Sequence, residues 1–227
     1  MANPNLELLT SIANAMGALR EQVVFVGGCA TGLLITQPLV ADARATEDVD
    51  AIVEVASLVG YHALAAQLME KGFKQTMADN TPPFRWCWNG MQLDLVPLDE
   101  RVLGFANRWY KPGFEAAITA TLPSGLHLRH LSAPYFMATK LEAFNDRGNN
   151  DVYLSHDLED VITVVDGREE LISELTSAQP DVRDFVAQTL RGILRHPDFT
   201  NALPGIVSQS TRTGLVLQRF TRISEPT

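Results

Sequence analysis

Two aspartates at alternate positions, Asp48 and Asp50, begin the apolar run DVDAIVEV. Side chains alternate between the two faces of a strand, so both carboxylates should point to one side while Val49 points to the other. Like charges at this spacing repel, and burying either one costs several kcal/mol unless a positive charge compensates it. A divalent cation would supply that charge.

A third acid, Asp94, lies in the strand-like run MQLDLVP, where Gln92 and Val96 share its face. If this strand neighbours the Asp48 strand, the three carboxylates converge. Magnesium takes oxygen ligands and commonly combines one or two carboxylates with phosphate oxygens of a substrate. Converging carboxylates also allow a two-metal site to hold attacking and leaving oxygens in line.

A glycine pair, Gly27 and Gly28, follows the strand-like run QVVFV and precedes the helical pattern CATGLLI. Such a turn offers free backbone N–H groups and the positive end of a helix dipole to phosphate oxygens, and no side chain blocks the approach. An ordinary turn is the alternative for the glycines, as a solvated strand edge is for the aspartates. The order of the motifs therefore weighs more than any one of them.

The elements that would position these residues change in character near residue 131. Before it, strand-like runs alternate with helical patterns, including the amphipathic run YHALAAQLMEKG, which ends at Gly72. Asn89 and Gly90 separate two alternating runs, which is typical of a two-residue hairpin turn, and PSG separates the strands of a second hairpin. This half is predicted to be α/β.

After Ser132, a candidate N-cap, the pattern is helical. One helix should end at Gly148, and another should begin at a Ser155 cap and end at Gly167, with further helices around 169–178 and 181–195. The sequence therefore predicts two domains, 1–131 and 132–227, that pack directly with a cleft between them.

The composition is that of a globular protein: 227 residues, 46% hydrophobic and 20% charged. A formal charge of −9 argues against a protein that coats nucleic acid. The C-terminal stretch is nevertheless basic, and we interpret it as a solvated helical surface, with a polyanion contact left open. Its arginines are Arg191, Arg195, Arg212, Arg219 and Arg222.

No apolar run approaches the ~18 to 20 residues of a membrane span, and the N-terminus does not resemble a signal peptide, so we expect a cytoplasmic protein with no membrane partner. The two cysteines, Cys29 and Cys87, lack the spacing of a zinc site. We expect both to be buried thiols.

The segments VGGCAT, RATEDVDAIV and LDLVP together resemble the catalytic core of the DNA polymerase β superfamily of nucleotidyltransferases. Its signature is a Gly-Gly or Gly-Ser turn, a DxD strand and a later third Asp. The segments ATKLEAFNDRG and DVYLSHDLEDVITVV are similar to the helical half of the AbiEii/AbiGii-type toxin nucleotidyltransferases. The resemblance implies an α+β (α/β) fold: a polymerase β-like core with a mixed sheet flanked by helices, plus a C-terminal helical domain.

The resemblance also implies roles for single residues. Asp48, Asp50 and Asp94 would bind metal, and Asp94 could also deprotonate the acceptor hydroxyl. Gly27 and Gly28 would hold the triphosphate. Cys29 departs from the family pattern, because Ser or Thr often stands there.

Residues outside this core complete the implied site. Lys140 would contact the triphosphate from the helical half, and Arg147 lies on the same helix stripe. Asp157 matches the family's late acidic motif, whereas Asp160 is better explained as an N-terminal helix acid or a partner for Arg147. Two further nucleotide-binding candidates, Arg44 and Thr46, match the family's R-x-[ST]-x-D-x-D lead-in.

The implied activity is transfer of NMP from an NTP to a hydroxyl acceptor, with Mg²⁺ or Mn²⁺ and release of pyrophosphate. The helical motifs favour a toxin or phage-defence enzyme that acts on tRNA or other RNA, with a possible antitoxin partner. A small-molecule transferase of the antibiotic-modifying type fits the acidic body, and a catalytically silent binding or regulatory protein is the third alternative.

Overall fold

The structure, a computed structural model, describes residues 3–37, 43–76 and 81–225. The chain divides into two compact units. The first comprises Met1–Gly32 and Arg44–Ser132, and the second comprises Leu33–Ala43 and Ala133–Thr227.

The described part of the first unit is built on a seven-stranded mixed sheet with the order β3-β4-β5-β2-β1-β7-β6. At its centre β2 pairs with β5 in parallel and with β1 in antiparallel orientation. The predicted mixed sheet is confirmed. The strands are β1 (Val23–Val26), β2 (Asp48–Val53), β3 (Lys74–Gln75), β4 (Arg85–Trp88), β5 (Met91–Pro97), β6 (Ile118–Thr121) and β7 (His127–His130).

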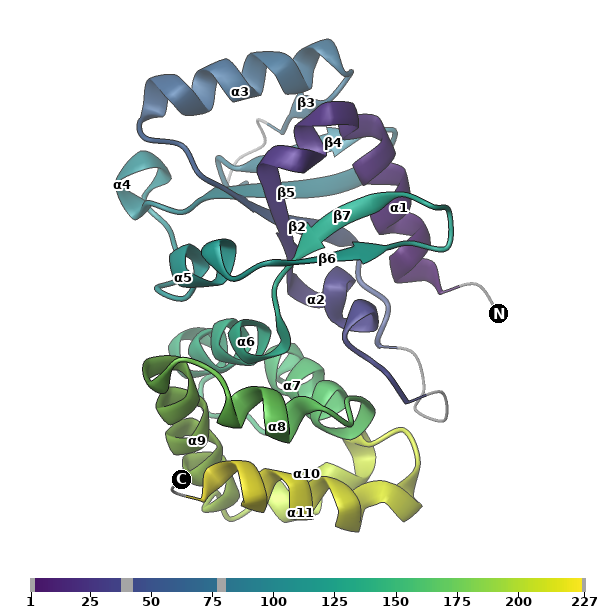
Figure 1. The fold of residues 1–227 in the computed structure, drawn as a ribbon, viewed down its shortest axis with the longest axis vertical. Coiled ribbons are helices and arrows are strands. Elements are labelled where there is room, and N and C mark those ends of the chain that lie inside the picture. Colours follow the sequence, from purple (N-terminus) through teal and green to yellow (C-terminus); the bar gives the residue numbers. More distant parts are fainter. Residues whose placement is uncertain (1–2, 38–42, 77–80, 226–227) are drawn as a thin grey trace. The chain divides into compact units, whose positions relative to one another are not determined.

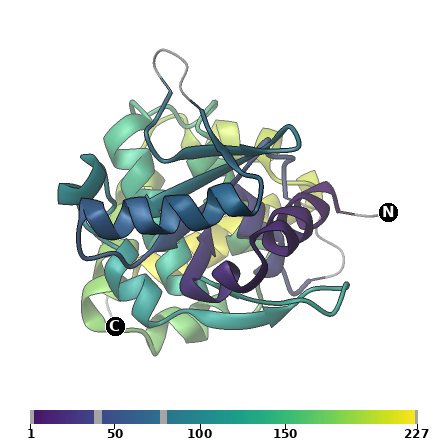
Figure 2. The same ribbon diagram turned by 90° about the horizontal axis from the view of Figure 1, so that it is seen from above.

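Two long helices, α1 (Pro4–Met16) and α3 (Leu58–Glu70), lie over the sheet (Figures 1 and 2). The side chain of Asn3 caps α1 by accepting hydrogen bonds from two backbone N–H groups. The Ser57 hydroxyl caps α3 by accepting from the Gly60 N–H, and the chain leaves α3 through Gly72, whose φ of 88° suits glycine. Shorter helices are α2 (Gly27–Ala30), α4 (Glu100–Leu103) and α5 (Tyr110–Glu115), with 3₁₀ turns at Gly17–Gln22 and Thr31–Leu33.

Both predicted hairpins are present. Asn89 and Gly90 have φ of 47° and 82°, the positive values of a type I′ turn, so Trp88 pairs with Met91. The second hairpin joins β6 to β7 through Gly125. In contrast, the helix predicted over CATGLLI is shorter than expected, because the chain leaves the helical conformation after residue 33.

The second unit is helical (Figure 1). Ser155 caps α7 as predicted, since its hydroxyl accepts from the Leu158 N–H at 3.3 Å. The segment after residue 33 joins this unit: the N–H groups of Thr36 and Gln37 both donate to the Gly167 carbonyl. The helices are α6 (Ala133–Arg147), α7 (His156–Gly167), α8 (Leu171–Thr176), α9 (Pro180–Leu194), α10 (Phe199–Ile206) and α11 (Thr213–Ser224), with a 3₁₀ turn at Ser210–Arg212.

Candidate functional site

A cluster of three carboxylates forms on β2 and β5. The parallel register places Asp50 opposite Asp94 and Asp48 opposite Gln92, so all three acids share one face. One oxygen from each aspartate lies within 4.8 Å of the others. The convergence expected from the sequence is therefore present, and the spacing allows one cation to be shared.

Arg85 on β4 balances part of this negative charge. Its Nε donates to Asp94 Oδ1 and its Nη2 donates to Asp94 Oδ2, both at 2.7 Å, in a two-pronged ion pair. The same Nη2 lies 3.3 Å from Asp48 Oδ2. Because the Asp94 side chain is only 8% exposed, its carboxylate depends on this guanidinium for compensation. Sequence reasoning did not select Arg85.

Gly27 stands directly against the cluster. Its φ of 71° lies in the left-handed region that favours glycine, and a Cβ there would approach Asp50 Oδ2 to 1.9 Å. Val26, the preceding residue, pairs with Asp50 across β1 and β2. A side chain at position 27 would therefore collide with a candidate metal ligand. Gly28, buried in α2, completes the pair at the start of the helix, as the sequence predicted.

The lead-in to β2 is held by α1. Thr46 Oγ1 donates to Asp48 Oδ1 at 2.9 Å, which orients that carboxylate. Asn5, only 1% exposed, accepts from the Thr46 N–H at 3.0 Å and donates to the Arg44 carbonyl at 2.8 Å. Thr46 therefore helps to position a candidate metal ligand. Asn5, a positioning residue, was not found from the sequence.

The thiol of Cys29 is buried beside this lead-in and donates to the Asn5 carbonyl at 3.4 Å. Burial raises the pKa of Cys29 well above its ordinary value, and the charges of Asp50 and Asp48 raise it further. Both effects favour the neutral thiol, and Cys29 is the buried thiol that the sequence predicted. Cys87 is half-buried, and both cysteines are free thiols.

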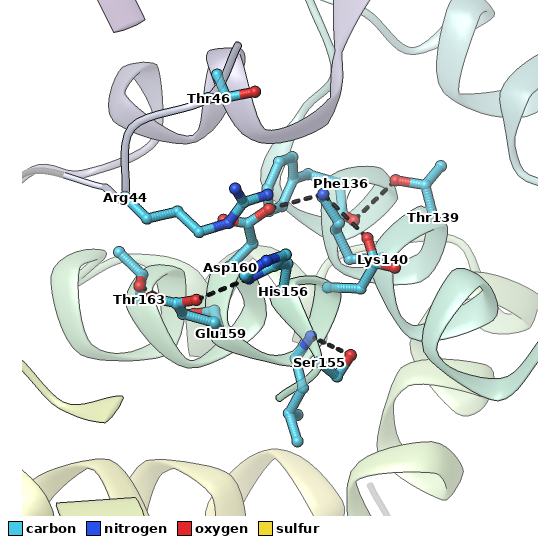
Figure 3. A network of polar contacts seen from close by, with 12 residues as sticks. Arg44, Thr46, Phe136, Thr139, Lys140, Ser155, His156, Glu159, Asp160 and Thr163 are labelled. Atoms are coloured by element: carbon cyan, nitrogen blue, oxygen red, sulfur yellow. Dashed lines mark hydrogen bonds and ion pairs between the residues drawn. The ribbon is translucent and has the colours of Figure 1, made fainter. Parts of the chain in front are cut away.

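A second charged cluster lies within the helical unit (Figure 3). Lys140 Nζ on α6 contacts Asp157 Oδ1 at 3.1 Å and Asp160 Oδ2 at 2.7 Å, both on α7. Arg147 donates from Nε and Nη2 to the two oxygens of Asp157. The lysine and the arginine, which lie on one stripe of α6, therefore both contact Asp157.

Burial and nearby charge act in opposite directions on Asp157. Burial opposes the charge of Asp157, but Lys140 and Arg147 outweigh it and hold the pKa of Asp157 below its ordinary value of 3.8. The side chains of Lys140 and Asp160 are 9% and 1% exposed, whereas that of Arg147 is 69% exposed. Arg147 is thus the accessible cation of the cluster.

Three arginines of the basic C-terminal stretch bind within the helical unit. Arg191 donates to the Ser224 carbonyl, Arg212 to Asp166, and Arg219 to the carbonyls of Val165 and Asp166. The last two stabilise the C-terminal end of α7, where carbonyls lack helical partners. These contacts favour a structural role over binding of a polyanion.

No protein-family profile matches the chain, and no curated protein matches its sequence. A solved structure that it resembles is an antigenic nucleotidyltransferase-like protein from Paracoccidioides brasiliensis, with 18% identity and a TM-score of 0.51 over 92% of this chain and 96% of that one. The antibiotic-resistance factor ANT(2'')-Ia is similar at 14% identity and a TM-score of 0.49, over 85% of this chain and 94% of that chain.

The protein thus has a nucleotidyltransferase-like fold. In the described part of the chain, no helix combines the length and the apolar character needed to cross a membrane.

Proposed function

We propose that this protein is a metal-dependent nucleotidyltransferase that moves an NMP group from an NTP to a hydroxyl acceptor. The observation that carries the proposal is the carboxylate cluster of Asp48, Asp50 and Asp94, with ligand oxygens within 4.8 Å of one another. Like charges at this distance cost folding free energy, and a cation-binding role explains why they are assembled. The nucleotidyltransferase-like fold supports the same activity.

The donor set fits Mg²⁺ or Mn²⁺, since hard divalent cations prefer carboxylate oxygens. When bound, the metal would neutralise charge that builds on the phosphoryl oxygens and on departing pyrophosphate. Asp48 and Asp50 would hold it, with Thr46 orienting Asp48. Asp94 would serve as the third ligand and accept the proton of the attacking hydroxyl.

Other residues would bind the nucleotide. Gly27 and Gly28 would hold the triphosphate, and the absence of a side chain at Gly27 leaves the space beside Asp50 clear for phosphate oxygens. Lys140 and Arg147 would neutralise the triphosphate from the helical unit, with Asp157 positioning both cations. Arg44, in the lead-in to the DxD strand, would also bind the nucleotide.

The hydroxyl acceptor could belong to either of two classes, an RNA or a small molecule. The helical motifs support a toxin or phage-defence enzyme that acts on tRNA or other RNA, in the cytoplasm and with an antitoxin partner. The overall charge of −9 supports a small-molecule acceptor, as in antibiotic-modifying transferases, because RNA binding requires cationic surface. The internal contacts of Arg191, Arg212 and Arg219 favour the small-molecule class.

The test is transfer of label from NTPs, in Mg²⁺ or Mn²⁺, to total tRNA or to a panel of hydroxylated small molecules. We expect one acceptor class to be labelled by the wild type and neither by Asp48→Ala. Asp184→Ala, at a 67% exposed carboxylate outside the cluster, is the matched control and should retain transfer. Absence of transfer under every condition would favour a catalytically silent binding protein.

A further inference from the structure

Arg85 lies beside Asp94 and supplies the positive charge that a bound cation would otherwise supply to this carboxylate. In the β4–β5 pairing Arg85 is directly opposite Asp94, so the register fixes the two side chains together. Both oxygens of Asp94 accept a hydrogen bond from the guanidinium, and Asp48 lies 3.3 Å from it. Arg85 therefore touches two of the three candidate metal ligands.

This arrangement hinders a metal in two ways. An ionised carboxylate has about four lone-pair sites, and the two-pronged contact uses one on each oxygen of Asp94. In addition, a guanidinium carries a permanent positive charge. A divalent cation about 5 Å from that charge, even in a water-like dielectric, would bind roughly ten- to twentyfold more weakly than without it.

We infer that Arg85 is an internal counter-ion that competes with the divalent cation for Asp94 and Asp48 and so lowers the metal affinity of the site. This inference rests on the proposed function, because it concerns the metal site of that reaction. Without metal, Arg85 compensates the buried carboxylate of Asp94. Metal binding displaces the guanidinium from Asp94. Asp94 therefore contacts either the metal or Arg85, but not both at once.

The experiment measures the dissociation constant of Mn²⁺ alone for the full chain, from the electron paramagnetic resonance signal of free Mn²⁺. Arg85→Gln removes the charge, and we expect it to bind Mn²⁺ about tenfold more tightly than the wild type. Arg85→Lys keeps a charge without the planar fork, so it should lie between them. Arg101→Gln, which removes an exposed guanidinium paired with Asp99, is the control and should match the wild type.

Thermal melting adds a readout that does not depend on catalysis. Arg85→Gln leaves Asp94 uncompensated, so without metal it should melt below the wild type, and saturating Mn²⁺ should raise its melting temperature more. If Arg85→Gln does not fold even with Mn²⁺, the affinity of Arg85→Lys decides the question alone.

Two outcomes would overturn the inference in different ways. Equal or weaker Mn²⁺ binding by both Arg85 variants, beside a wild type that binds, would mean that Arg85 orients Asp94 as a ligand; the proposed function would survive. Failure of the wild type and of every variant to bind Mn²⁺ would instead refute the metal site and, with it, the proposed nucleotidyl transfer.

Discussion

Replacing Asp50 with Asn removes one charge from the carboxylate cluster and keeps the shape of the side chain. At the 4.8 Å limit of the cluster, two unit charges repel by about 1 kcal/mol in water and about 3.5 kcal/mol at an effective dielectric constant of 20. Asp50 has two such neighbours, and the positive charge of Arg85, which also acts on Asp50, offsets part of the repulsion. Because Asp50 is partly exposed to water, the lower value applies, and relief of about 1 kcal/mol is expected.

For a chain of this size, 1 kcal/mol corresponds to about 2 to 4 °C in melting temperature. We therefore expect metal-free Asp50→Asn to melt at or slightly above the wild type, measured by differential scanning calorimetry. In Mg²⁺ the order should reverse, since the variant loses the stabilisation that metal binding gives the wild type. Transfer of label from NTP should be abolished.

Asp184→Asn, an exposed change outside the cluster, controls for the loss of a carboxylate and should follow the wild type in both conditions. A fall of more than about 5 °C in metal-free Asp50→Asn would correspond to well over 1 kcal/mol of lost stability. That result would refute the reasoning, because it would mean that Asp50 stabilises the fold through its charge.

Two further changes test other contacts. Gly27→Ala should lower the free energy of unfolding by about 1 to 3 kcal/mol and abolish stabilisation by Mg²⁺, because its Cβ meets Asp50. Gly125→Ala, with a φ of 81° but open space around it, should show only the backbone cost and keep the Mg²⁺ effect; urea denaturation of both, with and without Mg²⁺, separates the two causes. For Asp157, a folded pKa below 3.8 means that its contribution to stability is complete above that pH and is lost as the pH falls through the folded pKa. The stability difference between wild type and Asp157→Asn should therefore be constant from about pH 5 to 7 and shrink below about pH 4, and a difference that grows on acidification would contradict the ion pair with Lys140.

The strands that carry the carboxylate cluster could be predicted, because their sequence patterns involve residues close together in the chain. The turn at Asn89 and Gly90 fixes the pairing of β4 with β5, and alternation along β5 then places Asp94 on a defined face. Convergence with Asp48 and Asp50 needed only that β5 lie beside β2, which the fold provides.

Arg85 could have been found by the same reasoning. A two-residue turn at 89–90 makes the pairs 88 with 91, 87 with 92, 86 with 93 and 85 with 94. The sequence therefore contained a basic residue directly opposite the third acid. The hairpin was recognised, but its register was not followed as far as Arg85.

Other features depend on contacts between distant parts of the chain. Asn5 reaches Thr46 across 41 positions, and nothing near Asn5 in the sequence indicates a polar partner for its buried amide. Lys140 likewise pairs with Asp160 across a loop whose path the sequence does not determine. Helical periodicity gave the faces of α6 and α7, but not which acid would meet which cation.

The association of Leu33–Ala43 with the helical unit affects how the protein can be divided. The backbone passes from one unit to the other three times, after Gly32, after Ala43 and after Ser132, so a single cut cannot separate them. A fragment that stops at Ser132 would retain Leu34, fully buried in the intact chain, without the helices that cover it. Truncation at that boundary would thus expose an apolar segment and promote aggregation. A circularly permuted chain, or two fragments expressed together, would keep that segment covered.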